Sequence, residues 1–362
     1  MNTESRSILA EVVSAIGSPS AQWLERAKAH LDSLTKPLGS LGRLEEIAAQ
    51  LVSIRQEDSS KPLRKAVYVF AADHGITAEG VSAYPSEVTR EMVLNFLAKG
   101  AAINVLARLH HVEINVADVG VDADLGNLEG LIGRKVRRGT RNMLLEPAMS
   151  EVELTQALEV GLVLAKEAKH RGHSLLAVGE MGIGNTSAAA AITSVLTNTP
   201  VALVTGAGTG LNASAQLHKR QVIEAVVEKH FAFTGSGSTP SALEVLRCVG
   251  GLEIAAMTGL ILGAARYGIA VVADGFISTA AAAIAFAIEP RVRGYLFAGH
   301  QSEEPGHRVL LDYIGLKPIL SLNMRLGEGT GAVLAMPMIE SAMALYNQMA
   351  TFASAGVSEA VR

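Results

Sequence analysis

Apolar residues along the chain follow two patterns that alternate. Short continuous apolar runs are typical of strands buried on both faces of a parallel sheet. Between them, apolar residues recur at helical spacing over longer stretches. The runs predict strands at 66–75, 111–120, 174–178, 200–210, 268–276 and 294–300, with a short extended run at 318–322.

The stretches with helical spacing fill the intervals between these runs. We predict helices in the first 58 residues, interrupted by Pro and Gly within 36–51, and then at 85–109, 150–171, 212–229, 241–266, 278–288 and 325–353. A glycine-serine loop is expected at 234–238. Six apolar strands that alternate with helices predict an α/β fold, a doubly wound and mainly parallel Rossmann-like sheet.

Polar side chains gather where the predicted strands end. Ligands of such sheets bind beyond the carboxyl ends of the strands. The residues expected at that edge are Asp73, His74, Asp118, Glu180, Asp274 and His300.

A glycine turn at 179–186, with the sequence GEMGIGNT, separates a predicted strand from an alanine-rich helix. Gly182 and Gly184 allow a tight turn and a close approach to a ligand. The free N–H groups at the start of the helix favour a phosphate. Glu180 would repel a phosphate, so we expect it to face another part of the ligand. The glycine spacing is also compatible with ordinary strand-helix punctuation, because it is neither GxGxxG nor a P-loop.

Three residues follow in the sequence that can cap this helix, namely Asn185, Thr186 and Ser187. A second glycine turn lies at 206–210, and Lys219 lies on the second turn of the helix after it. Both turns can hold a phosphate.

Glu328 lies between two glycines in RLGEGTGA, residues 325–332. It can serve as a partner for the helix dipole, or as a base that projects into a cleft. Two phosphate-binding turns with a carboxylate base suit a transferase that acts on a sugar phosphate.

Basic residues form two groups. Lys36 and Arg43 lie near a helix-turn-helix, where we favour solvated charges over an anion contact. The segment 125–147 carries five more, for which we favour a partner subunit or solvent: Arg134, Lys135, Arg137, Arg138 and Arg141.

Composition excludes several classes of protein. The formal net charge of -4 gives no polyanion-binding surface, so we expect no nucleic-acid partner. The apolar runs are too short and too rich in small residues to span a bilayer, so no membrane partner is expected. The lone Cys248 excludes an intrachain disulfide and suits a reducing cytoplasm. Residues 1–21 lack the apolar core of a signal peptide.

We expect neither a metal nor a cofactor. The residues of metal-ligand type have no tight spacing such as HExxH: Asp73, His74, His300, Glu303, Glu304 and His307. No GxSxG elbow is present, and Cys248 lies in an apolar helix.

The motifs together resemble one family over nearly the whole chain, in the expected order. It is the nicotinate-nucleotide–dimethylbenzimidazole phosphoribosyltransferases of cobalamin biosynthesis. The segments that carry the resemblance are KPLGSLGRLE near the start, 72–85, 179–191, 205–210, 274–282, 298–307 and 325–332. Of these, GEMGIGNT together with RLGEGTGA is highly specific.

The resemblance implies a reaction. Phosphoribose moves from nicotinate mononucleotide to 5,6-dimethylbenzimidazole with inversion at C1′, giving α-ribazole 5′-phosphate and nicotinate. It implies that Glu328 is the general base and that Glu180 faces the ribose or the developing positive charge. The candidate substrate-binding residues are Ser82, Tyr84, Val88, Gly182, Ile183, Gly184, Asn185, Thr186, Gly206, Gly208, Thr209, Gly210, Lys219, Asp274 and Gly327.

The resemblance also implies a cytoplasmic homodimer with two domains. The large α/β domain is expected at 60–325, and a small helical domain from 1–59 together with 326–362. Two other functions are weaker. A binding protein without catalysis gains nothing from two loop carboxylates, and a dehydrogenase would need the absent GxGxxG.

Overall fold

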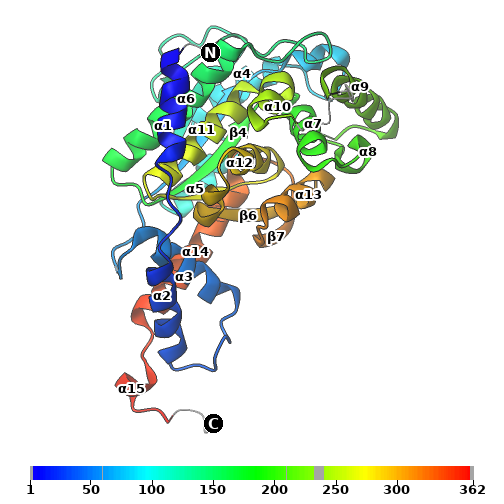
Figure 1. Ribbon diagram of the computed structural model, residues 1–362. Coiled ribbons are helices and arrows are strands. Elements are labelled where there is room, and N and C mark those ends of the chain that lie inside the picture. The colour runs from blue at the N-terminus through cyan, green and yellow to red at the C-terminus, as the bar shows by residue number, and fades with distance from the viewer. Residues whose placement is uncertain (1–2, 59, 209, 232–239, 359–362) are drawn as a thin grey trace.

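The computed structural model describes residues 3–58, 60–208, 210–231 and 240–358 (Figure 1). A seven-stranded sheet forms its centre, with the order β3-β2-β1-β4-β5-β6-β7 and every neighbouring pair parallel. The strand order reverses between β1 and β4, as in doubly wound sheets. The predicted fold class is therefore confirmed. The strands are β1 (Lys65–Ala72), β2 (Glu113–Gly120), β3 (Leu131–Gly133), β4 (Leu175–Met181), β5 (Ala270–Ala273), β6 (Leu296–Ser302) and β7 (Pro318–Met324).

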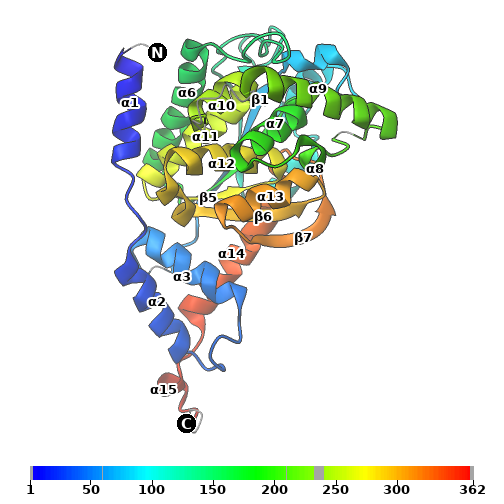
Figure 2. The ribbon, with the colours of Figure 1, turned by 45° about the vertical axis from the view of Figure 1, so that its right-hand side comes forward.

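Helices cover both faces of the sheet (Figures 1 and 2). On one face, α11 packs against β1, β2, β4 and β5, and α12 lies beside it; on the other, α14 packs against β4, β5, β6 and β7. The α-helices are α1 (Thr3–Ser14), α2 (Ala21–Ser33), α3 (Arg43–Arg55), α4 (Glu87–Leu97), α5 (Ala102–Leu109), α6 (Glu151–His170), α7 (Asn185–Thr197), α8 (Val201–Val204), α9 (Ala213–Phe231), α10 (Ala242–Val249), α11 (Leu252–Arg266), α12 (Phe276–Ile288), α13 (Pro305–Ile314), α14 (Thr330–Gln348) and α15 (Phe352–Ala355), and the 3₁₀ helices are η1 (Gly75–Glu79) and η2 (Pro290–Tyr295).

The core explains why the central strands read as unbroken apolar runs. Every residue of β1 and of β5 is buried, because helices cover both faces of the sheet. Polar residues appear near the ends of β4 and β6, where Glu180 and His300 lie at the carboxyl edge of the sheet.

A second group of helices extends away from the sheet. In Figures 1 and 2, α2, α3 and the C-terminal part of α14 form a lobe at the bottom of the view, with α15 beyond them. Leu34 bridges to Thr351 in this lobe. The first helix does not belong to it, since α1 packs against α6 and α11.

The predicted strand at 200–210 is wrong. Val201–Val204 form the short helix α8. Val201 and Val204 are buried while Leu203 is 63% exposed, which is the burial pattern of a helical turn. A run as short as VALV cannot be assigned to strand or helix by periodicity alone, and Pro200 at the N-cap favours the helix.

Four smaller differences have local causes. The helix predicted at 85–109 breaks between α4 and α5, where Lys99 takes a left-handed conformation. The helix predicted at 241–266 breaks at Gly250 and Gly251. The run at 318–322 is the edge strand β7, and the three-residue β3 was not predicted. The loop at 234–238 lies outside the described residues.

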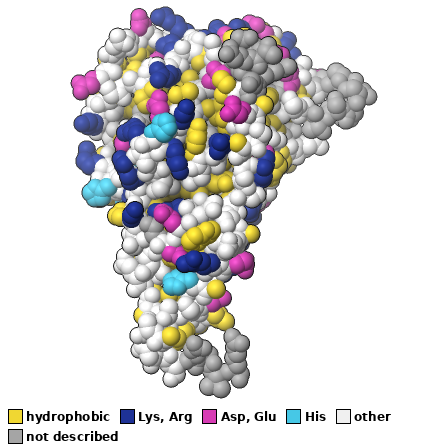
Figure 3. Space-filling view, turned by 60° about the vertical axis from the view of Figure 1, so that its left-hand side comes forward, with side chains coloured by type: hydrophobic (Ala, Val, Ile, Leu, Met, Phe, Trp, Pro, Cys, Tyr) yellow, Lys and Arg dark blue, Asp and Glu magenta, His cyan; other side chains and the backbone are white. Residues whose placement is uncertain are grey.

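Most of the basic residues that sequence placed in solvent form ion pairs within the chain. Lys36 is buried and pairs with Glu45 at 2.9 Å. In the basic segment, Lys135 pairs with Asp118, and Arg141 with Glu153. On the face drawn in Figure 3, lysine and arginine side chains stand singly, separated by apolar and uncharged surface.

One stretch among the described residues, Glu87–Leu109, is long and apolar enough to cross a membrane by length and composition. The structure divides it into α4 and α5. A third of its most apolar window is buried within the chain.

Candidate active site

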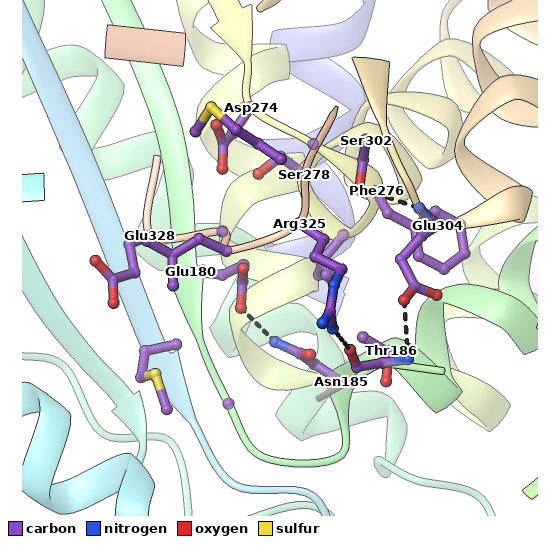
Figure 4. Close-up of a pocket in the computed structure, with 18 of the residues that line it drawn as sticks. Glu180, Asn185, Thr186, Asp274, Phe276, Ser278, Ser302, Glu304, Arg325 and Glu328 are labelled. Carbon is purple, nitrogen blue, oxygen red and sulfur yellow. Dashed lines mark hydrogen bonds between the residues drawn. The ribbon is translucent and has the colours of Figure 1, made fainter. Parts of the chain in front are cut away.

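A cavity of about 690 Å³ opens at the carboxyl edge of the sheet. Figure 4 shows Glu328 and Glu180 toward one side of it, Glu304 toward the other and Arg325 between them. Its walls come from the loops after β4, β5, β6 and β7 together with the start of α4. The size is typical of pockets that hold small-molecule ligands.

Glu180 is the penultimate residue of β4 and lines the cavity. The strand runs through Met181, so the turn predicted at 179–186 begins only after it. Glu180 is buried, and one carboxylate oxygen accepts a hydrogen bond from the side-chain amide of Asn185. Gly184 is the N-cap of α7 and has a φ of 95°, which favours glycine. The prediction that Asn185, Thr186 or Ser187 caps this helix is wrong, because the N-cap residue is Gly184, which has no side chain.

The turn before α14 is strained. Three consecutive residues, Gly327, Glu328 and Gly329, have φ values of 85°, 63° and 87°. Left-handed backbone is costly for a residue with a side chain, and such strain gathers at functional sites. A side chain at Gly327 would collide with Glu180, so the two turns lie against each other.

Asp274 holds this strained turn in place from the end of β5. Its two carboxylate oxygens accept hydrogen bonds from the backbone N–H groups of Gly329, at 3.1 Å, and Ala332, at 2.9 Å. A carboxylate at the start of α14 also interacts favourably with the helix dipole. Asp274 thus fixes the backbone that carries Glu328.

The other end of the cavity surrounds the second glycine turn. Lys219 is 1% exposed and its Nζ donates to Thr186 Oγ1 at 2.7 Å. The backbone N–H of Gly208 donates to Glu304 at 2.9 Å, and Arg325 donates to the Gly208 carbonyl at 2.9 Å. Burial lowers the pKa of Lys219 to about 8, although the nearby charge of Glu304 acts to raise it. This end therefore holds two cations and a backbone donor around one turn.

Carboxylates crowd the first end. Burial, and then the charges of Glu253 and Asp274, raise the pKa of Glu180 to about 8. Burial also raises the pKa of Glu328 and of Asp274. A carboxylate whose pKa lies nearer to neutrality is better suited to accept and return a proton at neutral pH.

We expect Glu180→Gln to melt about 5 °C above the unmodified protein near pH 8.5, on the scale of a few degrees per kcal/mol. The folded pKa of Glu180, about 8, lies above its ordinary value. Folding therefore retains a proton that the unfolded chain releases, and stability is lost as pH rises toward 8. Glutamine mimics the protonated form, so the difference should shrink toward pH 5. Scanning calorimetry at several pH values measures it.

The matched control is Glu129→Gln, since Glu129 is exposed. This variant should track the unmodified protein at every pH. A Glu180→Gln difference that is constant with pH would mean that Glu180 is ionised throughout the range.

Three of the residues of metal-ligand type, His74, Asp73 and His307, have partners within the chain. His74 pairs with Glu253 at 2.6 Å, and Asp73 accepts from the backbone of Asp122. His307 contacts Thr279 and the backbone of Ser302. Within the described ranges, His, Cys, Asp and Glu side chains form no group of three or more suited to a metal ion.

Most of the predicted site residues line the cavity, and several do not. Those that line it are Tyr84, Val88, Glu180, Gly182, Ile183, Asn185, Thr186, Gly208, Asp274, Gly327 and Glu328. Ser82, Gly184, Gly206, Gly210 and Lys219 do not line it, and Thr209 lies outside the described residues. The Ser82 hydroxyl accepts from the backbone of Tyr84 instead, and Lys219 reaches the cavity edge through Thr186.

Sequence reasoning did not assign several residues of the lining. The apolar ones include Met92, Met181, Phe276 and Met324, and the polar ones are Ser278, Ser302, Glu304 and Arg325. His300, which was expected at this edge of the sheet but given no contact with substrate, also lines the cavity. Most of these residues lie in the same motifs as the predicted residues, in DGFISTAAA, AGHQSEEPGH and RLGEGTGA. That shared location was the available signal.

Comparisons with known proteins agree with each other over nearly the whole chain. A family model described as phosphoribosyltransferase matches residues 16–357. A curated relative from Geobacter sulfurreducens, named nicotinate-nucleotide–dimethylbenzimidazole phosphoribosyltransferase, is 51% identical over 97% of this chain and 99% of its own. One of the same name from Chloroflexus aggregans is 49% identical over 98% and 99%. A crystal structure of CobT from Thermus thermophilus superposes with a TM-score of 0.88, at 46% identity, over 94% of this chain and all of that one.

Proposed function

The chain belongs to the nicotinate-nucleotide–dimethylbenzimidazole phosphoribosyltransferase family, and we propose that it moves phosphoribose from nicotinate mononucleotide to 5,6-dimethylbenzimidazole. The observation that carries the proposal is the cavity with two unlike ends. Buried carboxylates gather at one end, and Lys219, Arg325 and a glycine turn at the other. Nicotinate mononucleotide carries a positive charge on its pyridinium nitrogen and one phosphate at the other end, and it can span the two.

The nucleotide is oriented by charge. Its pyridinium ring is a cation, and it fits beside Glu180 and Glu328. Its 5′-phosphate fits at the Gly208 turn, where it replaces the contact between the Gly208 N–H and Glu304. A cation near Glu180 favours the ionised form of that carboxyl, so binding of the nucleotide makes the carboxylate available.

The bond between C1′ and the pyridinium nitrogen breaks without an acid. Nicotinate leaves with the bonding electron pair as a neutral ring, so its nitrogen needs no proton. C1′ becomes oxocarbenium-like as this bond stretches, and the buried carboxylate of Glu180 stabilises the developing positive charge.

Dimethylbenzimidazole attacks the opposite face of the ribose. One ring nitrogen forms the new bond to C1′, which inverts the β configuration to α. The other nitrogen loses its proton to Glu328, so that no cationic azolium remains. The products are α-ribazole 5′-phosphate, nicotinate and a proton on Glu328 that passes to solvent. Tyr84, Val88 and Met92 supply apolar walls for the benzimidazole near this end.

One assay tests the proposal. Nicotinate release from nicotinate mononucleotide is followed with and without dimethylbenzimidazole, in the presence of EDTA because no step uses a metal. We expect release that depends on the base, and α-ribazole 5′-phosphate by mass spectrometry. Release at the same rate without the base would indicate a hydrolase, and no release would reject the activity.

We also propose a cytoplasmic homodimer whose chain has a large domain at 60–325 and a small helical domain drawn from 1–59 and 326–362. The separate lobe of α2, α3 and the end of α14 supports this division (Figure 1), except that α1 packs against α6 and α11 and so goes with the large domain. Exposed apolar side chains on α5, Val105 and Leu109, support an interface between copies. A monomer mass in sedimentation equilibrium would contradict the dimer.

A further inference from the structure

Two buried histidines, His300 in β6 and His307 in α13, lie close together and differ in their hydrogen bonds. The ring centroids of His300 and His307 are 6.3 Å apart. His307 uses both nitrogens, one with Thr279 Oγ1 at 3.0 Å and one with the Ser302 N–H at 2.8 Å. Within the part of the chain that the structure describes, neither nitrogen of His300 has a hydrogen-bond partner. His300 lines the cavity and His307 does not.

A buried imidazole with no partner needs an explanation. His300 is 1% exposed, and burial of a polar group without a hydrogen bond is unfavourable. Unsatisfied buried groups of this kind are rare in native proteins. A ligand of the cavity is the partner that lies within reach.

Two glycines fix the orientation of the ring. A side chain at Gly331 would collide with His300 Nδ1, and a Cβ at Gly275 would lie 3.0 Å from His300 Cε1. Nδ1 is 3.7 Å from Asp274 Oδ1, which is longer than a hydrogen bond. Contacts of this kind in unliganded sites often tighten only when substrate binds. Nδ1 therefore faces Asp274, and Nε2 is the atom left for a ligand.

The position of the ring selects the part of the ligand. In Figure 4, Asp274 and Ser302 lie between Glu328 at one side and Glu304 at the other, and His300 is close to both of them. An anionic group next to Asp274 would be repelled. A hydroxyl carries no charge and can donate or accept, as a neutral imidazole can.

We propose that His300 binds a ribose hydroxyl of the nucleotide through Nε2, with Asp274 orienting the ring through Nδ1. This inference rests on the proposed function, because it assumes a nucleotide that spans the cavity. It makes His300 a residue that recognises the sugar rather than the base or the phosphate.

The test pairs two substitutions with two substrates. His300→Leu keeps a similar volume without polar atoms, and His300→Gln can place an amide near Nε2. We expect His300→Leu to lower kcat/KM for nicotinate mononucleotide about tenfold, the effect of one lost hydrogen bond. Its melting temperature should be unchanged or higher, because an unpaired polar group is removed. His300→Gln should recover at least a third of the lost activity.

The 2′-deoxy and 3′-deoxy forms of the nucleotide identify the hydroxyl. With the unmodified enzyme, one of these deoxy nucleotides should have a kcat/KM about tenfold below that of nicotinate mononucleotide. With His300→Leu, the same deoxy nucleotide should show no further loss, because both changes remove the same contact. His307→Leu is the control. It should melt lower, since it leaves Thr279 and the Ser302 N–H unpaired, while the deoxy penalty stays that of the unmodified enzyme.

Two outcomes overturn the inference. The first is a His300→Leu variant that keeps the kcat/KM of the unmodified enzyme; a lower melting temperature of that variant would then indicate bound solvent as the partner of His300. The second is that each deoxy nucleotide has the same penalty in kcat/KM with His300→Leu as with the unmodified enzyme. If His300→Leu does not fold, His300→Ala, which also removes both ring nitrogens, takes its place in the comparison. An unmodified enzyme that does not release nicotinate rejects the proposed function instead, and calorimetric binding of ribose 5-phosphate to the same variants then tests His300.

Discussion

Glu328→Gln should lower turnover by about 10²–10⁴-fold, the usual contribution of a general base. Glutamine has nearly the size of glutamate and can still accept a hydrogen bond from the benzimidazole N–H, so the KM for dimethylbenzimidazole should change little. It cannot take the proton. Attack would then build a cationic azolium whose proton residue 328 can no longer take.

The geometry sharpens this prediction. Glu328 keeps a left-handed backbone between two glycines, and one of its carboxylate oxygens is buried without a partner in the described chain. Burial raises the pKa of Glu328 by more than the backbone N–H of Ile103 lowers it. A carboxylate that served only the dipole of α14 would need neither feature, since Asp274 already accepts from that helix N-terminus.

Steady-state kinetics with a melting curve separate the two roles. A purely electrostatic partner of the helix contributes about 0.3–1 kcal/mol of stability and little rate. Asp124→Asn, at an exposed loop carboxylate away from the cavity lining, is the control and should keep full turnover. A folded Glu328→Gln variant with more than about a tenth of normal turnover, judged against the expected loss, would move the base to Glu180.

The central strands were predictable because local and global signals agree there. β1 after Lys65 and the first four residues of β4 are apolar runs, each with a glycine segment after it, so burial and turn chemistry point to the same element. The run at 200–210 carried a similar signal, since VALV at 201–204 is as long an apolar run as Leu175–Val178. Four apolar residues cannot separate a strand from a helix by periodicity, and the burial of 201 and 204 with exposure of 203 that marks a helical turn is visible only in the structure.

The sequence motifs predicted individual residues of the cavity but not which of these residues contact each other. Glu180 and Glu328 belong to glycine-rich motifs that are visible in the sequence, one at the end of β4 and one in the turn before α14. That the turn at 327–329 presses against β4 depends on the strand order, which brings segments far apart in the chain into contact. The same holds for Asp274, which sequence assigned to substrate and which binds the backbone of α14. Lys219 was predicted on its helix, but its burial against α7 arises from packing that no local pattern records.

Loss of the phosphate from the substrate should have the second large effect. Nicotinate riboside lacks the 5′-phosphate, and we expect its kcat/KM to be at least about 100-fold below that of nicotinate mononucleotide. Each charge-assisted hydrogen bond contributes about 1.5–3 kcal/mol, or roughly tenfold or more in affinity. Lys219, Arg325 and the N–H groups of the two glycine turns offer several such contacts.

Lys219→Met assigns part of this loss to one residue. Methionine fits the buried position, and the variant should lose about tenfold to 100-fold in kcat/KM for the nucleotide, as one charge-assisted contact predicts, and nothing for the riboside.

The pKa of Lys219 is lowered to about 8 by burial, so the ammonium is present below that pH and is lost above it. The nucleotide should therefore lose kcat/KM above about pH 8, and the riboside should lack that part of the profile. Lys229→Met, on the exposed side of the same helix, should match the unmodified enzyme. Equal losses on nucleotide and riboside would make Lys219 a structural residue held by Thr186, and full activity on both would place the phosphate at Arg325.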